Sequence, residues 1–171
     1  MTTSNVFRAA RYGAVIATAL TVVAMWLYPG GTYLNGAVEG YSFFQNSLSD
    51  LGGTTGWNGR PNPGWPLHVL ASVLLALTGA ATLAGLVRVY SASSRARRAS
   101  VAAAVVVLVA CGGLVGAGFT PHDQLPALHG RFALLAVGSL PIATSLMFLA
   151  TAHDHRFPRR VPAAWLALPQ S

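Results

Sequence analysis

The sequence has few charged residues and almost no cysteine. Charged side chains make up 9% of its 171 residues, whereas 53% of the residues are apolar. A water-soluble fold with this composition would lack the charge that its surface needs. The 11 basic residues are all arginine, and lysine is absent. The single cysteine, Cys111, lies within an apolar run, so the sequence predicts no internal disulfide and no cysteine-based metal site.

Four apolar stretches are long enough to cross a bilayer as helices. A hydrocarbon core of roughly 30 Å requires about 20 helical residues, within a range of about 17 to 25. The stretches that meet this requirement are residues 9–28, 66–90, 101–119 and 132–151. The first resembles a signal peptide, but no convincing A-x-A cleavage site follows it, so we interpret it as an uncleaved anchor. The sequence predicts one all-α domain, a polytopic transmembrane helical bundle of about four spans.

The arginines predict how the bundle is oriented. With the N-terminus inside, nine arginines fall on the cytoplasmic side and two fall outside, which is the bias that normally sets orientation. We therefore expect a multi-pass protein of the bacterial inner (plasma) membrane with both termini cytoplasmic. Because the arginines sit in short groups beside apolar spans, we expect membrane lipids and no nucleic acid as partners. The inner nine are Arg8, Arg11, Arg88, Arg95, Arg97, Arg98, Arg156, Arg159 and Arg160, and the outer two are Arg60 and Arg131.

The connections between the spans differ in character. Residues 29–65 are too long for a simple turn, and their Gly, Asn, Ser, Thr and aromatic content predicts a structured outer loop with a short interfacial helix within 40–51. Residues 91–100 read as an exposed cytoplasmic turn. The tail 152–171 is broken by prolines and is predicted to lie along the cytoplasmic interface.

Two glycines of the third span, Gly112 and Gly116, have G-x-x-x-G spacing. Small residues at this spacing allow helices to approach closely. The first interpretation is close packing within the bundle. The alternative is that the Gly112/Gly116 face contacts a protein partner or a second copy of the chain.

Seven polar residues from four segments are predicted to meet at the outer membrane boundary. Neutral imidazole and carboxylate are suitable Zn²⁺ ligands, and three protein ligands with an open position would suit water activation. No H-E-x-x-H, C-x-x-C or G-x-S-x-G motif supports such a site, and boundary histidines also serve as hydrogen-bonding caps. The hypothetical metal ligands are His68, His122 and His129, and the hypothetical catalytic residues are Asp50, Ser49 and Asp123, with Ser47 beside them.

Local structural roles compete with these assignments. Ser49 and Asp50 precede a Gly-Gly pair, a pattern in which Ser and Asp cap helix ends and the glycines permit left-handed turns. Asp123 is likewise suited to cap the fourth span. The group His153–His155 falls at the opposite end of the bundle, about 30 Å away by helix rise, so it is excluded from the same site.

Three short motifs carry a resemblance to a known family. They are residues 46–52 (NSLSDLG), 118–123 (GFTPHD) and 128–129 (LH). Their order and spacing resemble the bacterial membrane proteins catalogued as domain of unknown function nine hundred and ninety-eight, a family similar in outline to the Frag, DRAM and Sfk membrane proteins. Members usually show six spans rather than four, and have Phe-Pro where this chain has Thr120-Pro121. The resemblance implies the fold and the location of a site, and supplies no reaction.

A fainter resemblance is to the membrane hydrolases that include alkaline ceramidases and adiponectin receptors. These proteins use a Ser, an Asp and three His around Zn²⁺, and the residues that could fill those roles here are Ser49 or Ser47, Asp50, His68, His122 and His129. They have seven spans and a His-x-x-x-His pair on a late helix, and this chain has neither. Two functions are therefore weighed: a non-enzymatic membrane component or accessory subunit, and a Zn²⁺-dependent hydrolase of lipid amides or esters. The first is favoured because the histidine set lacks a motif.

Overall fold

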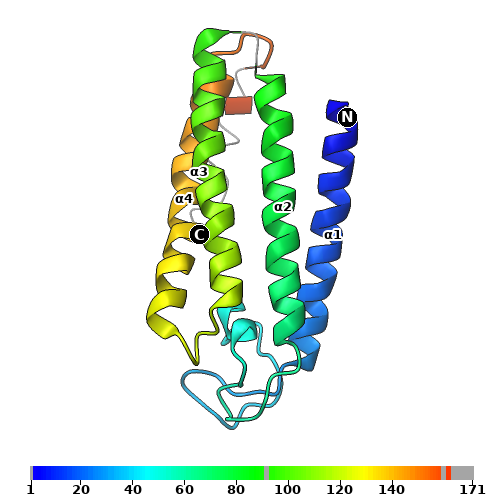
Figure 1. Ribbon diagram of the computed structural model, residues 1–171, viewed down its shortest axis with the longest axis vertical. Helices are drawn as coiled ribbons and strands as arrows, with labels where there is room; N and C mark the ends of the chain where they lie inside the picture. Colours follow the sequence, from blue (N-terminus) through cyan, green and yellow to red (C-terminus); the bar gives the residue numbers. More distant parts are fainter. Residues whose placement is uncertain (1, 91–92, 159–160, 163–171) are drawn as a thin grey trace.

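The protein is built from four long α-helices and one short 3-10 helix. The computed structural model describes residues 2–90, 93–158 and 161–162. The helices run antiparallel to their chain neighbours, with the longest connection at one end (Figure 1). In chain order they are α1 (Thr3–Leu27), the 3-10 helix η1 (Leu48–Gly52), α2 (Trp65–Val89), α3 (Ser94–Phe119) and α4 (Pro126–Ala152).

Each of the four α-helices is long and apolar enough to cross a membrane. They contain 25 to 27 residues, so at 1.5 Å per residue each is about 38 Å or longer, more than the roughly 30 Å of a hydrocarbon core. The four-span prediction is confirmed, and the chain is an integral membrane protein. α1, α3 and α4 begin six or seven residues before the apolar stretches of the sequence, whereas α2 matches its stretch to within one residue at each end.

The start of α3 corrects one expectation. Arg95, Arg97 and Arg98 were expected in an exposed turn, but they lie on the first turns of α3, which begins at Ser94. Ser93 caps this helix, since its hydroxyl accepts a hydrogen bond from the Ala96 backbone N–H at 3.0 Å. The cap allows the helix to begin before the apolar stretch does.

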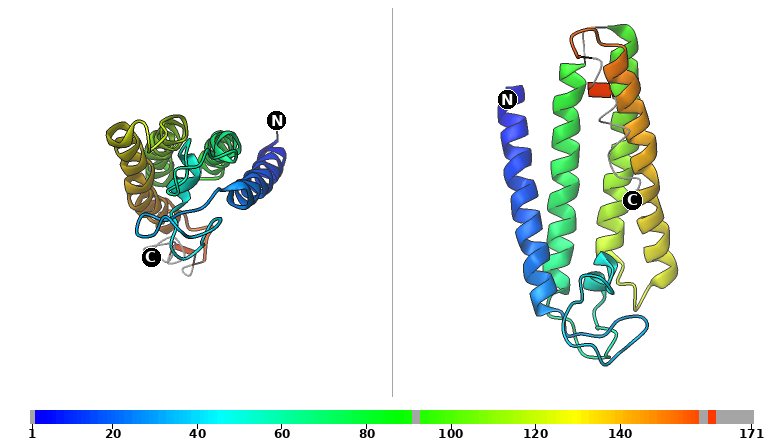
Figure 2. Two further views of the ribbon diagram at one scale, coloured as in Figure 1. Left: turned by 90° about the horizontal axis from the view of Figure 1, so that it is seen from below. Right: turned by 180° about the vertical axis from the view of Figure 1, so that it is seen from behind.

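The four helices form an open, curved row (Figure 2). α1 packs on α2, α2 on α3, and α3 on α4, so that α1 and α4 are the two ends of the row. The loop that contains η1 lies under the row on its concave side, where η1 contacts α2 and α3. The row is thus held by three helix seams and by one loop.

Buried alanines line these seams at intervals of seven residues. In lipid, helix association depends on close van der Waals packing, and small residues let the backbones approach. A seven-residue repeat keeps such a face aligned along a left-handed helix crossing. The alanines are Ala10, Ala17 and Ala24 on α1, and Ala96, Ala103, Ala110 and Ala117 on α3.

The loop between α1 and α2 is structured, as the sequence predicted. The short helix expected within 40–51 is present only as the 3-10 helix η1, which begins at Leu48. Gly40 has a left-handed φ of +66°, and the Asn46 side-chain oxygen accepts a hydrogen bond from the Ser42 N–H at 2.9 Å, which favours a turn over a helix. Phe43 and Phe44 follow Ser42 as an exposed, edge-to-face pair.

Hydrogen bonds join the helices at the end opposite the loop. The hydroxyls of Tyr90 and Thr151 lie 3.0 Å apart and are buried, so that α2 is pinned to α4. Asp154 forms an ion pair of 2.7 Å with Arg156, whose guanidinium also donates to the Val89 carbonyl. Of the tail expected along the interface, residues 159–160 and 163–171 lie outside the described residues.

The glycines of α3 differ sharply in their surroundings. A Cβ on Gly113 would lie 2.6 Å from the backbone nitrogen of Ala136 and 2.8 Å from the carbonyl oxygen of Phe132 on α4. A Cβ on Gly116 would collide with the Phe132 ring, whereas one on Gly112 would meet nothing within 4 Å. Gly113 and Gly116 therefore serve packing between α3 and α4, and Gly112 faces open space.

The Gly112 and Gly113 pair gives a matched test of the α3–α4 seam. Gly113→Ala should destabilise the protein by about 1–3 kcal/mol, because its new methyl group meets backbone that has no room to move. Gly112→Ala should be neutral or stabilising by up to about 1 kcal/mol, because alanine favours the helix. Thermal unfolding in detergent, followed by circular dichroism, measures both. Equal effects of the two substitutions would contradict the packing described.

Candidate functional site

All six candidate site residues lie at the end of the helices that carries the outer loop, but they do not form one constellation. Ser49, His68 and His129 line a groove on the concave side of the row. His122 does not line the groove, but its ring lies edge-to-face with that of His129, with centroids 6.1 Å apart. Asp50 and Asp123 belong to hydrogen-bond networks of the loop, described below.

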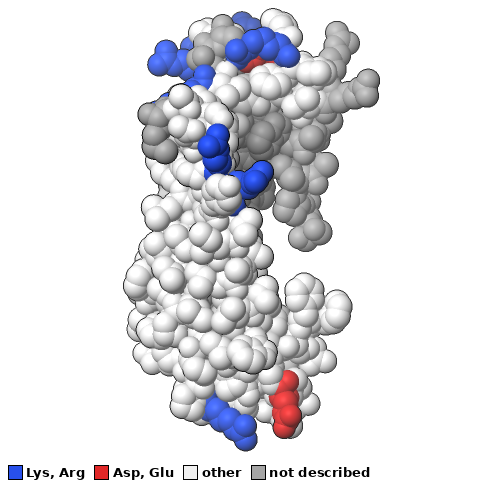
Figure 3. Space-filling view, turned by 90° about the vertical axis from the view of Figure 1, so that its right-hand side faces the viewer, with Lys and Arg blue, Asp and Glu red and all other residues white. Residues whose placement is uncertain are grey.

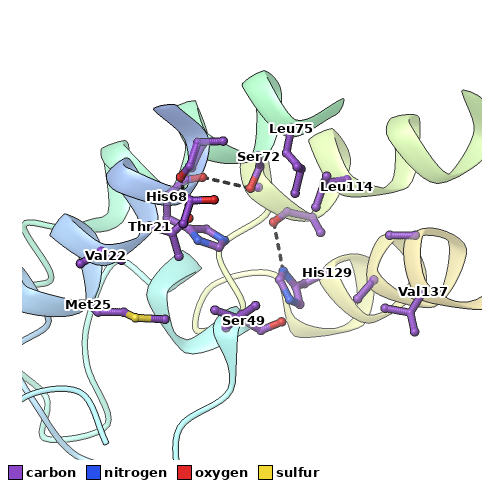
Figure 4. A pocket seen from close by; sticks show the side chains of 18 of the residues that line it. Thr21, Val22, Met25, Ser49, His68, Ser72, Leu75, Leu114, His129 and Val137 are labelled. Atoms are coloured by element: carbon purple, nitrogen blue, oxygen red, sulfur yellow. Dashed lines mark hydrogen bonds between the residues drawn. The ribbon is translucent and has the colours of Figure 1, made fainter. Parts of the chain in front are cut away.

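The groove has a volume of about 550 Å³ and is lined by all four α-helices. Its lining is mostly apolar, and the hydroxyls of Thr18, Thr21 and Ser72 within it donate to carbonyls of their own helices. Ser49, His68 and His129 form the end of the lining nearest the loop. Figure 4 shows the His68 and His129 rings turned into this space from opposite walls, with Ser49 of η1 below them. The groove thus joins an apolar channel to a polar end.

His129 is positioned by its backbone surroundings. Its Nδ1 lies 2.8 Å from the carbonyl oxygen of Thr120 and 3.1 Å from that of Ala117, both at the C-terminal end of α3. Because both neighbours are acceptors only, Nδ1 carries the proton and donates, which leaves the Nε2 of the neutral ring as an acceptor. This Nε2 is buried and has no hydrogen-bond partner among the described residues. Only 7% of His129 is exposed.

His68 occupies the facing wall, on the first turns of α2. Its Nδ1 is also buried without a partner in the described part of the chain. A Cβ on Gly52 would lie 3.3 Å from the Cδ2 of His68, so the glycine lets η1 pass close to the ring. Gly52 was expected to permit a left-handed turn, but the glycines with positive φ are at positions 30, 31, 40 and 59. Its role is close approach.

His122 is held by an aromatic stack. The Trp57 indole lies over its ring with centroids 5.3 Å apart and an interplanar angle of 26°. Its Nε2 is buried and unpartnered among the described residues, and a Cβ on Gly53 would come within 2.7 Å of this atom. The glycine pair of the loop thus accommodates two histidines, one for each glycine.

Asp50 is committed to the loop's own structure. Its carboxylate accepts hydrogen bonds from the Ser47 N–H at 2.9 Å, the Ser47 hydroxyl at 3.0 Å and the Asn46 side-chain amide at 2.9 Å. These bonds form a capping box at the start of η1. The capping alternative for Asp50 is the one that the geometry supports.

Asp123 fastens the loop to the α3–α4 connection. Its carboxylate accepts from the backbone N–H and the hydroxyl of Thr54, at 3.0 and 2.7 Å, and from those of Thr55, at 3.1 and 3.0 Å. Burial acts to raise the pKa of Asp123, but these hydrogen bonds outweigh it and lower the pKa below its ordinary value. Asp123 does not cap α4, whose N-cap residue is Leu125.

The described residues contain no group of three or more His, Cys, Asp or Glu arranged to hold a metal ion. His68 lines the groove with His129, whereas His122 is stacked on Trp57 and does not line it. Each of the three histidines nevertheless keeps one buried nitrogen free of protein partners within the described ranges. The donor chemistry suits a metal, whereas the arrangement does not gather three ligands.

Several residues that shape the site were missed by sequence reasoning. Asn62 donates to the carbonyls of Leu51 and Gly53, at 3.1 and 2.9 Å, and so holds the end of η1. Thr54 and Thr55 are the partners of Asp123. These contacts join residues up to 69 positions apart, and no local pattern marks them. The groove wall on α1, by contrast, has a readable signal in Ala17, Thr21 and Met25, which recur every four residues.

The group at 153–155 lies at the far end of the bundle, as expected. The Nδ1 of His153 lies 2.8 Å from the Leu149 carbonyl, an ordinary helix-end interaction. A hydrogen bond from Arg156 lowers the pKa of Asp154. These residues are separate from the groove.

Comparisons of the chain with protein-family models, curated proteins and solved structures each found no match. The family resemblance based on the three short motifs therefore stays a prediction. The structure establishes a four-span helical membrane protein with a structured loop between α1 and α2.

The Asp123 contacts predict a pH-dependent fastening of the loop. Because the folded-state pKa of Asp123 is lowered, the stabilisation is present above the ordinary carboxyl pKa and is lost as the pH falls below about 4. Asp123→Asn should remove the pH dependence of loop opening. It should also lower the free energy of loop opening by about 1 kcal/mol at neutral pH, because solvent exposure weakens a charge-assisted hydrogen bond. Hydrogen-exchange protection of the Thr54 and Thr55 amides, corrected for intrinsic rates, measures the opening.

Asp154→Asn is the matched control for this experiment, because that carboxylate lies at the opposite end. It should leave protection of the loop unchanged at every pH. Protection at Thr54 and Thr55 that is the same in wild type and Asp123→Asn would show that the carboxylate does not hold the loop.

Proposed function

We propose that this chain is a non-enzymatic component of the bacterial plasma membrane that holds a membrane lipid in its groove. One observation carries the proposal: the apolar groove ends in buried imidazole nitrogens that have no partner within the described residues, while the nearby carboxylates are already bonded. A groove of this form offers an apolar wall for a chain and hydrogen-bonding atoms for a polar group.

The bonding of the two carboxylates favours binding over catalysis. A general base must reach the proton that it removes with a free lone pair at hydrogen-bond distance. Asp50 accepts three hydrogen bonds and Asp123 accepts four, all from the loop. Ser49 lines the groove, but no carboxylate stands behind it in the lining to activate it.

The arginine distribution supports an orientation with both termini in the cytoplasm. Seven arginines of the inner set fall within the described residues and lie at the end opposite the loop, while Arg60 and Arg131 lie at the loop end. Figure 3 shows most of the basic side chains of the visible face toward one end, a basic side chain beside an acidic one at the other end, and none in between. The loop is therefore assigned to the extracytoplasmic side.

We also propose that the chain belongs to the family of unknown function named above and acts as an accessory subunit. The three motifs lie where the structure forms its site: η1, the α3–α4 connection and the start of α4. The open side of Gly112 is the part of α3 left for a protein partner or a second copy.

A metal-dependent hydrolase of lipid amides or esters is the second candidate. The observation in its favour is the set of free nitrogens on His68, His122 and His129, the donor type that Zn²⁺ prefers. Its weakness is that these histidines do not converge on one point in the described structure.

Incubation of the purified protein with labelled ester-linked and amide-linked lipids, followed by mass spectrometry and metal analysis, separates the two functions. We expect the lipids to remain intact and zinc to be substoichiometric. Stoichiometric zinc with hydrolysis that is lost in His122→Ala and kept in His153→Ala would overturn the binding role. His153 is the matched control because it lies at the other end of the bundle.

The orientation predicts which sites an impermeant thiol reagent reaches in intact cells. On a Cys111→Ser background, Leu34→Cys in the outer loop should label and Ser94→Cys at the start of α3 should not. Both positions are exposed, so the membrane rather than burial decides the result. Labelling of Ser94→Cys alone would reverse the topology.

A further inference from the structure

The polar end of the groove specifies the kind of lipid that it accepts. The Nε2 of His129 is the acceptor that the Nδ1 bonds leave free, and it belongs to a side chain that is more than nine-tenths buried. A ligand at this point must donate a hydrogen bond, because an acceptor would face the lone pair of the neutral ring. Hydroxyl groups supply such a donor.

The same end also provides groups for a second oxygen. The Ser49 hydroxyl rotates to donate or accept, and the Nδ1 of His68 is a further buried atom without a partner in the described chain. The lining contains no Arg, Asp or Glu among the described residues. A phosphate or carboxylate placed here would be buried without a fixed opposite charge, which is costly. The head group is therefore neutral.

The length of the groove indicates a single leaflet. On α4 the lining runs from His129 to Val137, eight positions, which corresponds to about 12 Å along the helix axis. One leaflet contributes about 15 Å of a hydrocarbon core of roughly 30 Å. The apolar channel thus fits an acyl chain that begins at the loop end, and it is too short to seat a partner helix along its whole span.

We propose that the groove binds a neutral, hydroxyl-bearing lipid with an acyl chain, such as a monoacylglycerol, whose hydroxyl donates to the Nε2 of His129. The acyl chain lies between α1 and α4 along Ala133 and Val137. This assignment names the ligand class of the proposed function and rests on it.

Equilibrium binding of two radiolabelled probes tests the assignment. The first is 1-oleoylglycerol, and the second is the same molecule with both hydroxyls methylated, which keeps the chain and removes the donors. The wild type should bind the first about three- to tenfold more tightly, the worth of a hydrogen bond to a buried acceptor. Equal binding of the two probes by the wild type overturns hydroxyl recognition.

His129→Asn is the sharpest variant, because its side-chain amide retains a donor near the position of Nδ1 for the Thr120 carbonyl and lacks Nε2. This variant should bind the two probes with about equal affinity, and its thermal unfolding temperature should stay close to that of the wild type. If this variant unfolds, Ser49→Ala serves as the second variant, with an expected loss of up to threefold for the diol probe alone. A preference unchanged in every folded variant overturns the role of this polar end.

Ala133→Trp should block the groove and abolish saturable binding of both probes, whereas Leu134→Trp, on an exposed position that does not line it, should not. Binding retained in Ala133→Trp places the lipid elsewhere. If Ala133→Trp instead converts a dimer to a monomer in sedimentation, a second copy occupies the groove and the lipid assignment is wrong.

Release of labelled oleate would overturn the non-enzymatic function separately, because it reports cleavage rather than binding.

Discussion

The bonds between Asp123 and the two threonines close a structure that the helix seams alone leave open. The extensive helix contacts among the described residues join neighbours in the row, and α1 and α4 stand at opposite ends. The loop that follows α1 is fastened through Thr54 and Thr55 to the connection that precedes α4. This fastening joins the two ends of the row, and with it η1, the glycine pair and the three histidines take their places. The polar end of the groove exists because the loop is fixed there.

Polar side chains at this end of the protein divide into two kinds. Asp50, Asn62 and Asp123 form hydrogen bonds with groups of the loop itself. The histidines are placed by that backbone and by aromatic or carbonyl neighbours, and each keeps one nitrogen free of protein partners in the described chain. In a low-dielectric boundary region an unpaired polar atom is costly, which gives the imidazoles a strong tendency to bind a ligand group. The division explains why residues of similar chemistry at one level of the membrane have different roles.

The sequence was sufficient for the helices and only partly sufficient for the site. Apolar length predicted four spans because the bilayer imposes its thickness on any helix that crosses it. It also predicted that the three histidines share one end of the bundle, since alternating helix directions fix which ends lie together. It did not show that His68 lines the groove while His122 stacks on Trp57, because these contacts depend on the path of the loop. Nor did it find the Asp123 partners, which are about 70 positions away, or the seven-residue alanine repeat, which is hidden within uniformly apolar runs. Asp50 illustrates the same limit: its sequence context fits both a cap and a base, and only its three bonds decide.

The alanine-lined seams fix the distance between helices but offer little resistance to one helix sliding along another, because a methyl group projects only slightly into the neighbouring helix. Vertical register must then come from directional bonds at the ends. α2 and α4 have such a bond in the Tyr90–Thr151 pair, and α3 and α4 have the carbonyls that receive His129. The side-chain hydrogen bonds of α1 in the described structure, from Thr18 and Thr21, return to its own backbone. α1 is therefore the wall of the groove whose displacement breaks the fewest directional contacts, and away from the loop its distance from α4 is set by dispersion forces within the helix seams.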